Sequence, residues 1–546
     1  MTAPASPPPP RRPPWLLLAA ALLLPLAFAL YTNHVWEDFF ITFRTSRNLV
    51  AGHGLVYQPG ERVCAFTSPL GTLLPAACAA LAGAGHDQAA LWLFRLVSAA
   101  LLAATAAILW RLAERLRLAA LGAALLFGLL LFDGKITDFS MNGMETALVL
   151  VAFAWTVLAL ADGPAAPWRL GLGLGGLMWG RPDGFIPAGV VLAGFALFAW
   201  RTDGRVDWRA VGRWLARSAL VGAALYLPWF LWAWWYYGSP VPNTIIAKAA
   251  VDTPAQQLAL LLSYPTTLLT GQAHIARIFM PAYYYLGGWP IGLFPFSLLL
   301  TLPAAFYFLV PRAHPVGRAL SLALLLGGGY LQIAPPNPWY AQVWQLLAIL
   351  VMAVVVSDLT RLFAWLQAAH GAARRHSAAL RVAVGILIGV QAALWACTAV
   401  QMRINQREIE DGIRRPIGLW LRAHARPDDR VMLEPLGYIG YFSGLKMLDN
   451  PGLCAPEVTA AIRSGARTWP ELITRLQPAW LVLRASEIRD IGTRSPDLLS
   501  VTYRAVEVFD ARNRLSGYRF FPGSGYAAFD SVFVVYQRAA ASAAPP

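Results

Sequence analysis

Two adjacent carboxylates, Glu37 and Asp38, follow the first apolar run, at the start of WEDFFITFRTSRNLVAGHGLVYQPGERV (36–63). A carboxylate beside a second carboxylate at a poorly hydrated membrane edge has a raised pKa, which suits proton abstraction from a hydroxyl group. Asp38 is therefore the predicted general base. The alternative is that both acids are interfacial residues that only flank a helix.

Three basic residues have the chemistry of phosphate ligands. Arg44 and Arg47 are three residues apart and share one face of a short predicted helix. Lys248 closes the outer-loop segment GSPVPNTIIAKA (238–249), in a chain with only three lysines. A guanidinium fork and a compact ammonium both suit a phosphate at the depth of lipid headgroups. The alternatives are arginines that snorkel to headgroups and a solvated lysine.

Three short motifs carry further polar and aromatic candidates: MNGMETAL (141–148), GRPDG (180–184) and NPWY (337–340). Glu145 begins an apolar run, where an acid also complements the helix dipole. Arg181 and Asp183 either pair with each other or line a cavity. Trp339 and Tyr340 are either aromatic belt residues or stacking partners for a sugar ring or an isoprenoid chain.

The composition indicates the elements that must position these residues. The 546 residues are 57% hydrophobic and 13% charged, with a mean hydropathy of +0.51, whereas soluble domains carry about 25% charged residues. Apolar runs of about 17–24 residues are long enough to cross a bilayer, which predicts a multi-span membrane protein. The net charge of +15 lies largely in short Arg-bearing loops, where it sets orientation and does not indicate nucleic-acid binding. The four cysteines have no metal-ligand spacing.

The arginines predict the topology. Arg11 and Arg12 precede the first span and place the N-terminus in the cytoplasm, and a cleaved signal peptide ending near AFA (27–29) is the alternative. The segment 68–83 contains Pro75 and is predicted to be re-entrant or interfacial. About eleven spans result, at 15–31, 89–110, 118–132, 143–161, 167–180, 184–200, 214–236, 289–311, 317–334, 339–357 and 381–401.

All candidate residues then lie on the outer side of the membrane. The predicted fold is an α-helical polytopic membrane protein with a C-terminal α/β domain, because short apolar runs alternate with helical stretches after residue 401. The predicted parts are a disordered cytoplasmic leader (1–14), a transmembrane domain (15–401) and a periplasmic domain (402–546). A transporter needs ionisable residues near the midplane, and the spans are almost free of them.

These motifs carry a family resemblance. The stretch EDFFITFRTSRNLVAGHGLVYQPGERVCAFTSPLGTLL resembles the first-loop signature of the GT-C superfamily of polyprenyl-phosphate-dependent glycosyltransferases. It is most similar to the branch that contains the mycobacterial terminal arabinofuranosyltransferases. MNGMETAL, RPDG and PVPNTIIAKA resemble that branch's SGLETAL, RPEG and LPNTFYAK, and VMLEPLGYIGYFSGLKMLDNPGL resembles its periplasmic-domain pattern. The similarity runs in order from near residue 36 to near residue 455.

The resemblance implies an inverting, inner-membrane glycosyltransferase. It would move a sugar, such as arabinofuranose, from a polyprenyl-phosphate donor to a hydroxyl acceptor on a periplasmic glycan, lipid or protein. The resemblance assigns the catalytic first-loop acid to Asp38, with Glu37 as its neighbour. Where the family has two aspartates this chain has Glu-Asp, so Glu37 takes the role if the first acid is the base. Arg44, Arg47 and Lys248 would contact the donor phosphate, with no cofactor, metal or nucleic acid involved.

Further roles also follow from the resemblance. Cys64 and Cys454 replace the family's usual residues, and both face the oxidising side. A disulfide between them is predicted, with two free thiols as the alternative.

The rival functions are a transporter or flippase for lipid-linked glycans and a non-catalytic envelope assembly protein. The residues predicted to bind substrate are His53, Glu145, Arg181, Asp183, Asn243, Trp339, Tyr340 and Glu434.

Overall fold

The structure is a computed structural model that describes residues 13–164, 166–200, 206–249, 253–335, 337–370 and 374–539. Most of the predicted cytoplasmic leader, including Arg11 and Arg12, lies outside the described residues. The part up to residue 405 is helical. Its α-helices are α1 (Trp15–Thr32), α2 (Glu37–Val50), α3 (Pro69–Ala82), α4 (Asp87–Arg115), α5 (Ala120–Leu131), α6 (Gly134–Met141), α7 (Thr146–Asp162), α8 (Pro167–Gly180), α9 (Phe185–Phe198), α10 (Trp208–Tyr237), α11 (Asn243–Ala249), α12 (Pro254–Leu269), α13 (Leu293–Phe306), α14 (Pro315–Ile333), α15 (Gln342–His370) and α16 (Arg374–Asn405).

Each of the eleven predicted spans corresponds to one of these helices. Within the described residues, six helices are long and apolar enough to cross a membrane alone, and a bent pair, α5 with α6, gives a seventh. The remaining predicted spans correspond to shorter helices, such as α7 and α13. The chain is therefore a multi-pass membrane protein by length and composition, and eleven crossings remain a prediction.

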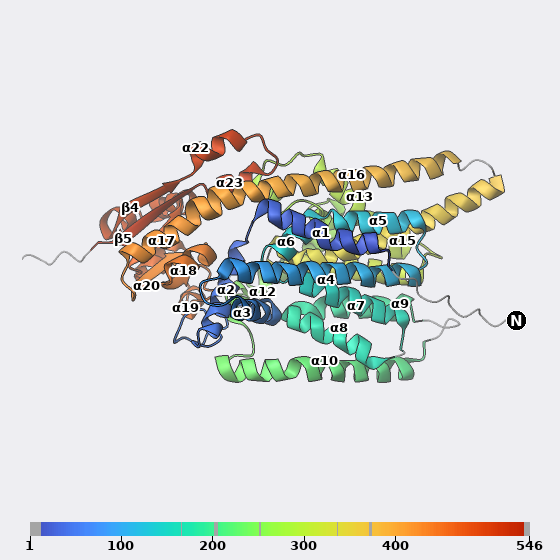
Figure 1. Cartoon of the computed structure of the whole chain (residues 1–546), viewed down its shortest axis with the longest axis horizontal. Coiled ribbons are helices and arrows are strands. Elements are labelled where there is room, and N and C mark those ends of the chain that lie inside the picture. Colours follow the sequence, from blue (N-terminus) through green and yellow to red (C-terminus); the bar gives the residue numbers. More distant parts are fainter. Residues whose placement is uncertain are drawn as a thin grey trace, which may run out of the picture.

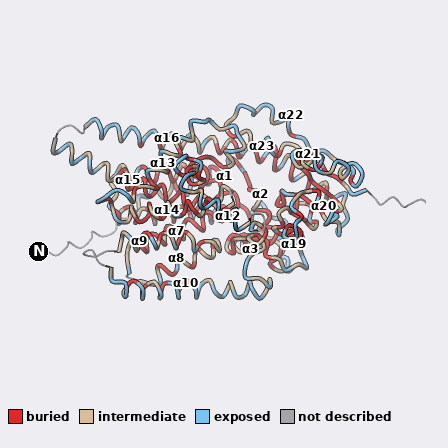
Figure 2. The backbone as a smooth tube through the Cα atoms, turned by 180° about the vertical axis from the view of Figure 1, so that it is seen from behind, coloured by how far each residue is buried: buried red, intermediate tan, exposed pale blue. Residues whose placement is uncertain are grey.

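The helices run side by side, and the polar loops gather at one end of the bundle. Figure 1 shows α2 and α3 at the same end as the C-terminal sheet, while the α15–α16 hairpin projects from the opposite end. Along the outer side, α10 is mostly exposed (Figure 2), as expected for a helix that faces lipid. Helix α3 has 14 residues, so it is about 21 Å long and too short to cross a hydrocarbon core of about 30 Å by itself.

The tail contains a mixed five-stranded sheet, as the alternating pattern predicts. The strand order is β2-β1-β3-β5-β4, with β1 parallel to both β2 and β3 and with β5 antiparallel to β3 and β4. Apolar side chains are buried on both faces of the sheet. The strands are β1 (Arg430–Leu433), β2 (Lys446–Asp449), β3 (Trp480–Arg484), β4 (Tyr503–Asp510) and β5 (Val532–Arg538), and the helices are α17 (Arg415–His424), α18 (Leu436–Ser443), α19 (Pro456–Arg463), α20 (Trp469–Leu476), α21 (Ala485–Arg494), α22 (Arg512–Leu515) and α23 (Ser524–Phe529).

One helical rod joins the bundle to this sheet. Helix α16 continues through a π-helix (Gln406–Arg414) into α17, so that helical structure runs unbroken from Arg375 to His424. Ile409, Ile413, Ile417 and Leu421 are all buried against the sheet, and their spacing of four residues keeps them on one helix face. The domain boundary predicted after residue 401 therefore falls inside a continuous helix, because the apolar stripe does not end there.

Candidate active site

Helix α2 carries the two first-loop acids on its first turn. The helix begins at Glu37 after an extended Trp36, whose N–H donates to the carbonyl of Asn142 at 3.0 Å. Phe39, Phe40 and Phe43 bury one side of α2. This packing fixes the start of the helix, where the positive end of the helix dipole favours carboxylates.

The two acids have different surroundings. Glu37 Oε1 accepts a hydrogen bond from the N–H of Gly437, at the start of α18. A Cβ at Gly437 would lie 1.9 Å from the carbonyl oxygen of Glu37, so only glycine permits this approach. Among the described residues, no donor forms a hydrogen bond with the Asp38 carboxylate. Asp38 is thus the acid whose oxygens remain available to a substrate hydroxyl.

Burial among protein atoms also changes the pKa values of the pair. It raises the pKa of Asp38 to about 6, although the charge of Lys248 acts in the opposite direction. Burial and the negative charge of Asp38 raise the pKa of Glu37 well above its usual range. Glu145 adds further negative charge near Asp38. An acid with a pKa near neutral suits a general base.

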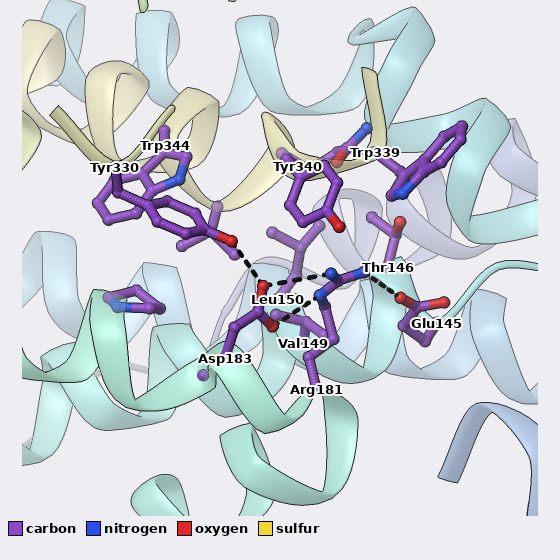
Figure 3. Close-up of a pocket in the computed structure, with 14 residues that line it drawn as sticks. Glu145, Thr146, Val149, Leu150, Arg181, Asp183, Tyr330, Trp339, Tyr340 and Trp344 are labelled. Carbon is purple, nitrogen blue, oxygen red and sulfur yellow. Dashed lines mark hydrogen bonds and ion pairs between the residues drawn. The ribbon is translucent and has the colours of Figure 1, made fainter. Parts of the chain in front are cut away.

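Five of the predicted substrate-binding residues line one polar pocket (Figure 3). Arg181 is held from both sides, because its Nη1 donates to Glu145 at 2.7 Å and its Nε donates to Asp183 at 2.9 Å. Its guanidinium lies 4.7 Å from the centre of the Tyr340 ring. The pocket is small, with a cavity volume of about 40 Å³, and is lined by Glu145, Thr146, Val149, Leu150, Arg181, Asp183, Gly184, Pro187, Tyr330, Trp339, Tyr340, Gln342, Val343 and Trp344. Arg181 and Asp183 therefore pair with each other and also line a cavity.

Lys248 does not line this pocket, but its side chain approaches two residues that do, and its contact with a phosphate stays a prediction. Its Nζ is 5.7 Å from the centre of the Trp339 ring and 5.9 Å from that of Tyr340. Among the described residues it forms no ion pair, so its charge remains available to an anion. It stands in the last turn of α11, and its charge acts on Asp38. The candidate general base is therefore within electrostatic reach of Lys248.

The two arginines of α2 have partners within the protein, Arg44 in the sheet domain and Arg47 in α4. Arg44 is buried, and its Nη1 donates to the carbonyls of Gly440 at 2.8 Å and Leu445 at 3.1 Å. Arg47 Nε lies 3.3 Å from Asp87 at the start of α4. Neither lines the polar pocket. The donors of Arg44 are occupied by carbonyls of the sheet domain, and its predicted contact with a donor phosphate has no support in this structure.

Two further predicted residues lie outside the pocket. His53 is exposed in the turn after α2, where its backbone N–H donates to the Asn48 carbonyl at 2.9 Å. Glu434 follows β1 and pairs with Arg484 Nη2 at 2.5 Å. Its charge still reaches both first-loop acids and raises their pKa values. Glu434 thus acts on the site electrostatically, whereas His53 has no contact that supports the predicted role.

The predicted disulfide is wrong in this structure. Cys64 and Cys454 are both free and buried, and the Cys454 thiol donates to Asp449 Oδ1 at 3.1 Å. Asn243 makes the link that the disulfide was expected to make. Its backbone N–H donates to the Cys64 carbonyl at 3.0 Å, and its Nδ2 donates to the Gly452 carbonyl at 2.8 Å. Asn243 therefore positions α11 and Lys248 rather than a substrate.

A large apolar cavity adjoins the polar pocket. The two share Asp183, and the apolar cavity has a volume of about 420 Å³. It is lined mainly by α10 and by the loop before α11, including Tyr226, Trp229, Phe230, Ala233, Tyr237, Val241, Pro242 and Ile245. Such a cavity suits a hydrocarbon chain whose polar end reaches Asp183.

The sequence analysis missed several polar residues near the site. Tyr330 donates to Asp183 Oδ2 at 2.7 Å, but it stands inside an apolar run that gives no signal. Asp133 accepts from Gln391 at 2.8 Å and fixes the bend between α5 and α6. Arg277 is the only arginine in the outer loop 238–288, a signal that was available. Among the described residues, no group of three or more His, Cys, Asp and Glu side chains is arranged to hold a metal ion.

Comparison with solved structures shows which fold this is. Over 97% of the chain and 99% of the other protein, the structure aligns with ArnT from Cupriavidus metallidurans bound to undecaprenyl phosphate, with a TM-score of 0.52 and 15% identity. The fold is that of the GT-C glycosyltransferases. The apo form of ArnT aligns with a TM-score of 0.49 and 14% identity. The resemblance predicted from the sequence is thus confirmed for the fold.

Sequence relatives match parts of this GT-C-fold protein. A terminal β-(1→2)-arabinofuranosyltransferase of Corynebacterium glutamicum is 30% identical over 239 residues, or 40% of the chain. The match spans only about a third of that relative's length, 33%. A family model described as a domain of unknown function, DUF8728, matches residues 401–532. That range includes the end of the helical rod and most of the sheet domain.

Proposed function

We propose that the protein is a polyprenyl-phosphate-dependent glycosyltransferase that acts at the outer face of the inner membrane, without a cofactor. The observation that carries the proposal is the meeting of a polar pocket with a large apolar cavity at Asp183. Lys248, which forms no ion pair among the described residues, lies near the pocket residues Trp339 and Tyr340. The apolar cavity would take the polyprenyl chain, and Lys248 would bind its phosphate. ArnT, which shares the fold, was solved with undecaprenyl phosphate, which supports this type of donor.

The proposed reaction uses Asp38 as its base. The carboxylate accepts the proton of the acceptor hydroxyl, the acceptor oxygen forms a bond to C1 of the sugar, and the bond between C1 and the phosphate oxygen breaks. Lys248 stabilises the negative charge of the departing polyprenyl phosphate, an electrostatic effect that is often large in such sites. An arabinofuranose-type pentose is the proposed sugar, supported by the Corynebacterium glutamicum relative.

Turnover of a synthetic polyprenyl-phosphate arabinofuranose tests the proposal. We expect the purified full chain in nanodiscs to release free polyprenyl phosphate, measured by mass spectrometry, whichever hydroxyl accepts the sugar. Lys248→Gln should raise the KM for the donor at least about tenfold, because charged hydrogen bonds contribute about 1.5–3 kcal/mol. Lys446→Gln is the matched control, since Lys446 pairs with Glu61 and Glu457 away from the pocket.

One outcome would favour a transporter instead. If no lipid-linked sugar is turned over while the same donor moves between the leaflets of proteoliposomes, the glycosyltransferase proposal is wrong. No structural feature of the described residues specifically supports transport.

The raised pKa of Asp38 predicts an acid limb in the pH dependence of turnover. Because burial raises this pKa to about 6, the carboxyl is protonated at lower pH and cannot accept a proton. Turnover at saturating donor should therefore rise between pH 5 and pH 7 with a midpoint near 6. A midpoint near 4, the usual value for an aspartate, or a flat profile would contradict Asp38 as a buried base.

A further inference from the structure

A second cavity adjoins the polar pocket and shares no lining residue with the apolar cavity. It has a cavity volume of about 330 Å³ and shares Tyr340 with the polar pocket. Three outer segments build it: the start of α6, residues 272–285 and the loop 335–341. None of its lining residues in the described part of the chain is acidic, and three are basic: Lys135, His274 and Arg277.

Arg277 is the basic residue that has aromatic neighbours but no acidic partner among the described residues, with its guanidinium 5.9 Å from the Tyr284 ring centre and 5.6 Å from that of Phe294. Its Nη1 donates to the Tyr284 hydroxyl at 3.1 Å, while its Nε is buried and has no hydrogen-bond partner. Among the described residues, no carboxylate pairs with it. Lys135, by contrast, donates to the carbonyl of Ile278 and lies near Asp133. A half-buried guanidinium with an unused N–H is suited to a carboxylate or phosphate.

The walls of the cavity suit a sugar ring. Tyr283, Tyr284, Tyr285 and Tyr340 line it together with the polar side chains of Gln272, His274 and Asn337. Tyr283 is held rigidly, because it stacks on Tyr526 with ring centres 4.5 Å apart and planes at 7°. Flat aromatic surfaces with a few convergent polar groups are typical of small-ligand sites.

The three cavities follow one another in a row. The apolar cavity meets the polar pocket at Asp183, and the polar pocket meets the second cavity at Tyr340. The charge of Asp38 acts on Tyr283, which lines the second cavity, and on Lys248, which lies near Tyr340. A donor that enters from the apolar cavity would thus meet a hydroxyl presented from the second cavity.

We propose that the second cavity binds the acceptor, a carbohydrate that carries a carboxylate or phosphate group, and that Arg277 holds this group. The assignment of this sugar as the acceptor rests on the proposed function. The site for an anionic sugar is inferred from the cavity alone. A neutral glycan would leave the guanidinium without a counter-charge.

Binding of three small sugars to the full chain in nanodiscs tests this. The probes are methyl β-D-glucuronide, α-D-glucose 1-phosphate and the neutral methyl β-D-glucoside, measured by saturation-transfer NMR titration. We expect at least one charged probe to bind about tenfold or more tightly than the glucoside. Arg277→Gln should abolish that preference, whereas Arg494→Gln, which changes an exposed arginine paired with Asp490, should keep it. The stronger charged probe identifies the carboxylate or the phosphate as the group.

The results separate this inference from the proposed function. Equal binding of all three probes, no binding of any, or a preference that survives Arg277→Gln overturns the inference, even if donor turnover is observed. If the preference depends on Arg277 but no donor is turned over, the proposed function fails and the anionic-sugar site remains. Lys248→Gln should weaken donor binding and leave the affinity for methyl β-D-glucuronide unchanged. This result would show that the two anion sites are distinct.

Discussion

Asp38→Asn is expected to lower the rate of sugar transfer about 10²–10⁴-fold, the usual contribution of a general base. The variant keeps the shape of the side chain and removes its ability to accept a proton. Donor affinity should be kept, because Lys248 and the apolar cavity are unchanged. The measurement is single-turnover transfer at saturating donor, with donor binding determined separately.

Glu37→Gln provides the matched comparison. The Glu37 side chain is already used as the acceptor for Gly437 N–H, so the amide variant should lower transfer far less than Asp38→Asn. A wild-type rate for Asp38→Asn together with an inactive Glu37→Gln would reassign the base to Glu37. That outcome would leave the proposed reaction in place and change only the residue that accepts the proton.

The second large effect is expected from Asp530→Ala, which should lower the stability of the fold rather than the rate of sugar transfer. Its buried carboxylate accepts from Arg414 of the π-helix and from Arg484 of β3. Asp530→Ala leaves both guanidinium groups short of a partner inside the protein. Removal of one member of a buried ion pair costs about 3–5 kcal/mol, a large share of the roughly 5–15 kcal/mol that stabilises a typical fold.

The apparent midpoint of thermal unfolding in detergent checks this prediction. Asp530→Ala should lower it by several degrees or prevent isolation of the folded chain. Asp510→Ala is the control, because Asp510 forms a comparable pair with Arg512 on the exposed surface, and such pairs contribute little. If both variants unfold at the same temperature as the wild type, the buried pairs do not hold the sheet domain to the rod.

Much of the fold could be predicted from local patterns. Each apolar run of sufficient length became a helix, and the acids of the first loop stand at the start of α2. Glu145, Arg181 and Tyr340 come from separate motifs and converge in one pocket. Polar residues next to apolar runs were a good guide here, because the ends of neighbouring spans meet at the same face.

The errors concern contacts between distant parts of the chain. Arg44 has the composition of a phosphate ligand, but its partners Gly440 and Leu445 lie 396 and 401 residues away. Cys454 is a free thiol in this structure, and its thiol and backbone N–H both donate hydrogen bonds to Asp449. Nothing in the local sequence around Arg44 specifies which long-range acceptor it reaches, so such roles need the tertiary structure.

Because helical structure is unbroken from Arg375 to His424, the orientation of the sheet domain relative to the bundle depends on the number of residues between them. Its 50 residues span about 75 Å, and each residue adds about 1.5 Å and a rotation of about 100°. Inserting or deleting one residue in this segment would turn the sheet by more than a quarter of a circle, away from Glu37 and Arg44. The number of residues in this helix therefore sets how the sheet domain faces the bundle. Substitutions on its exposed side should be tolerated, whereas the insertion or deletion of one residue should not.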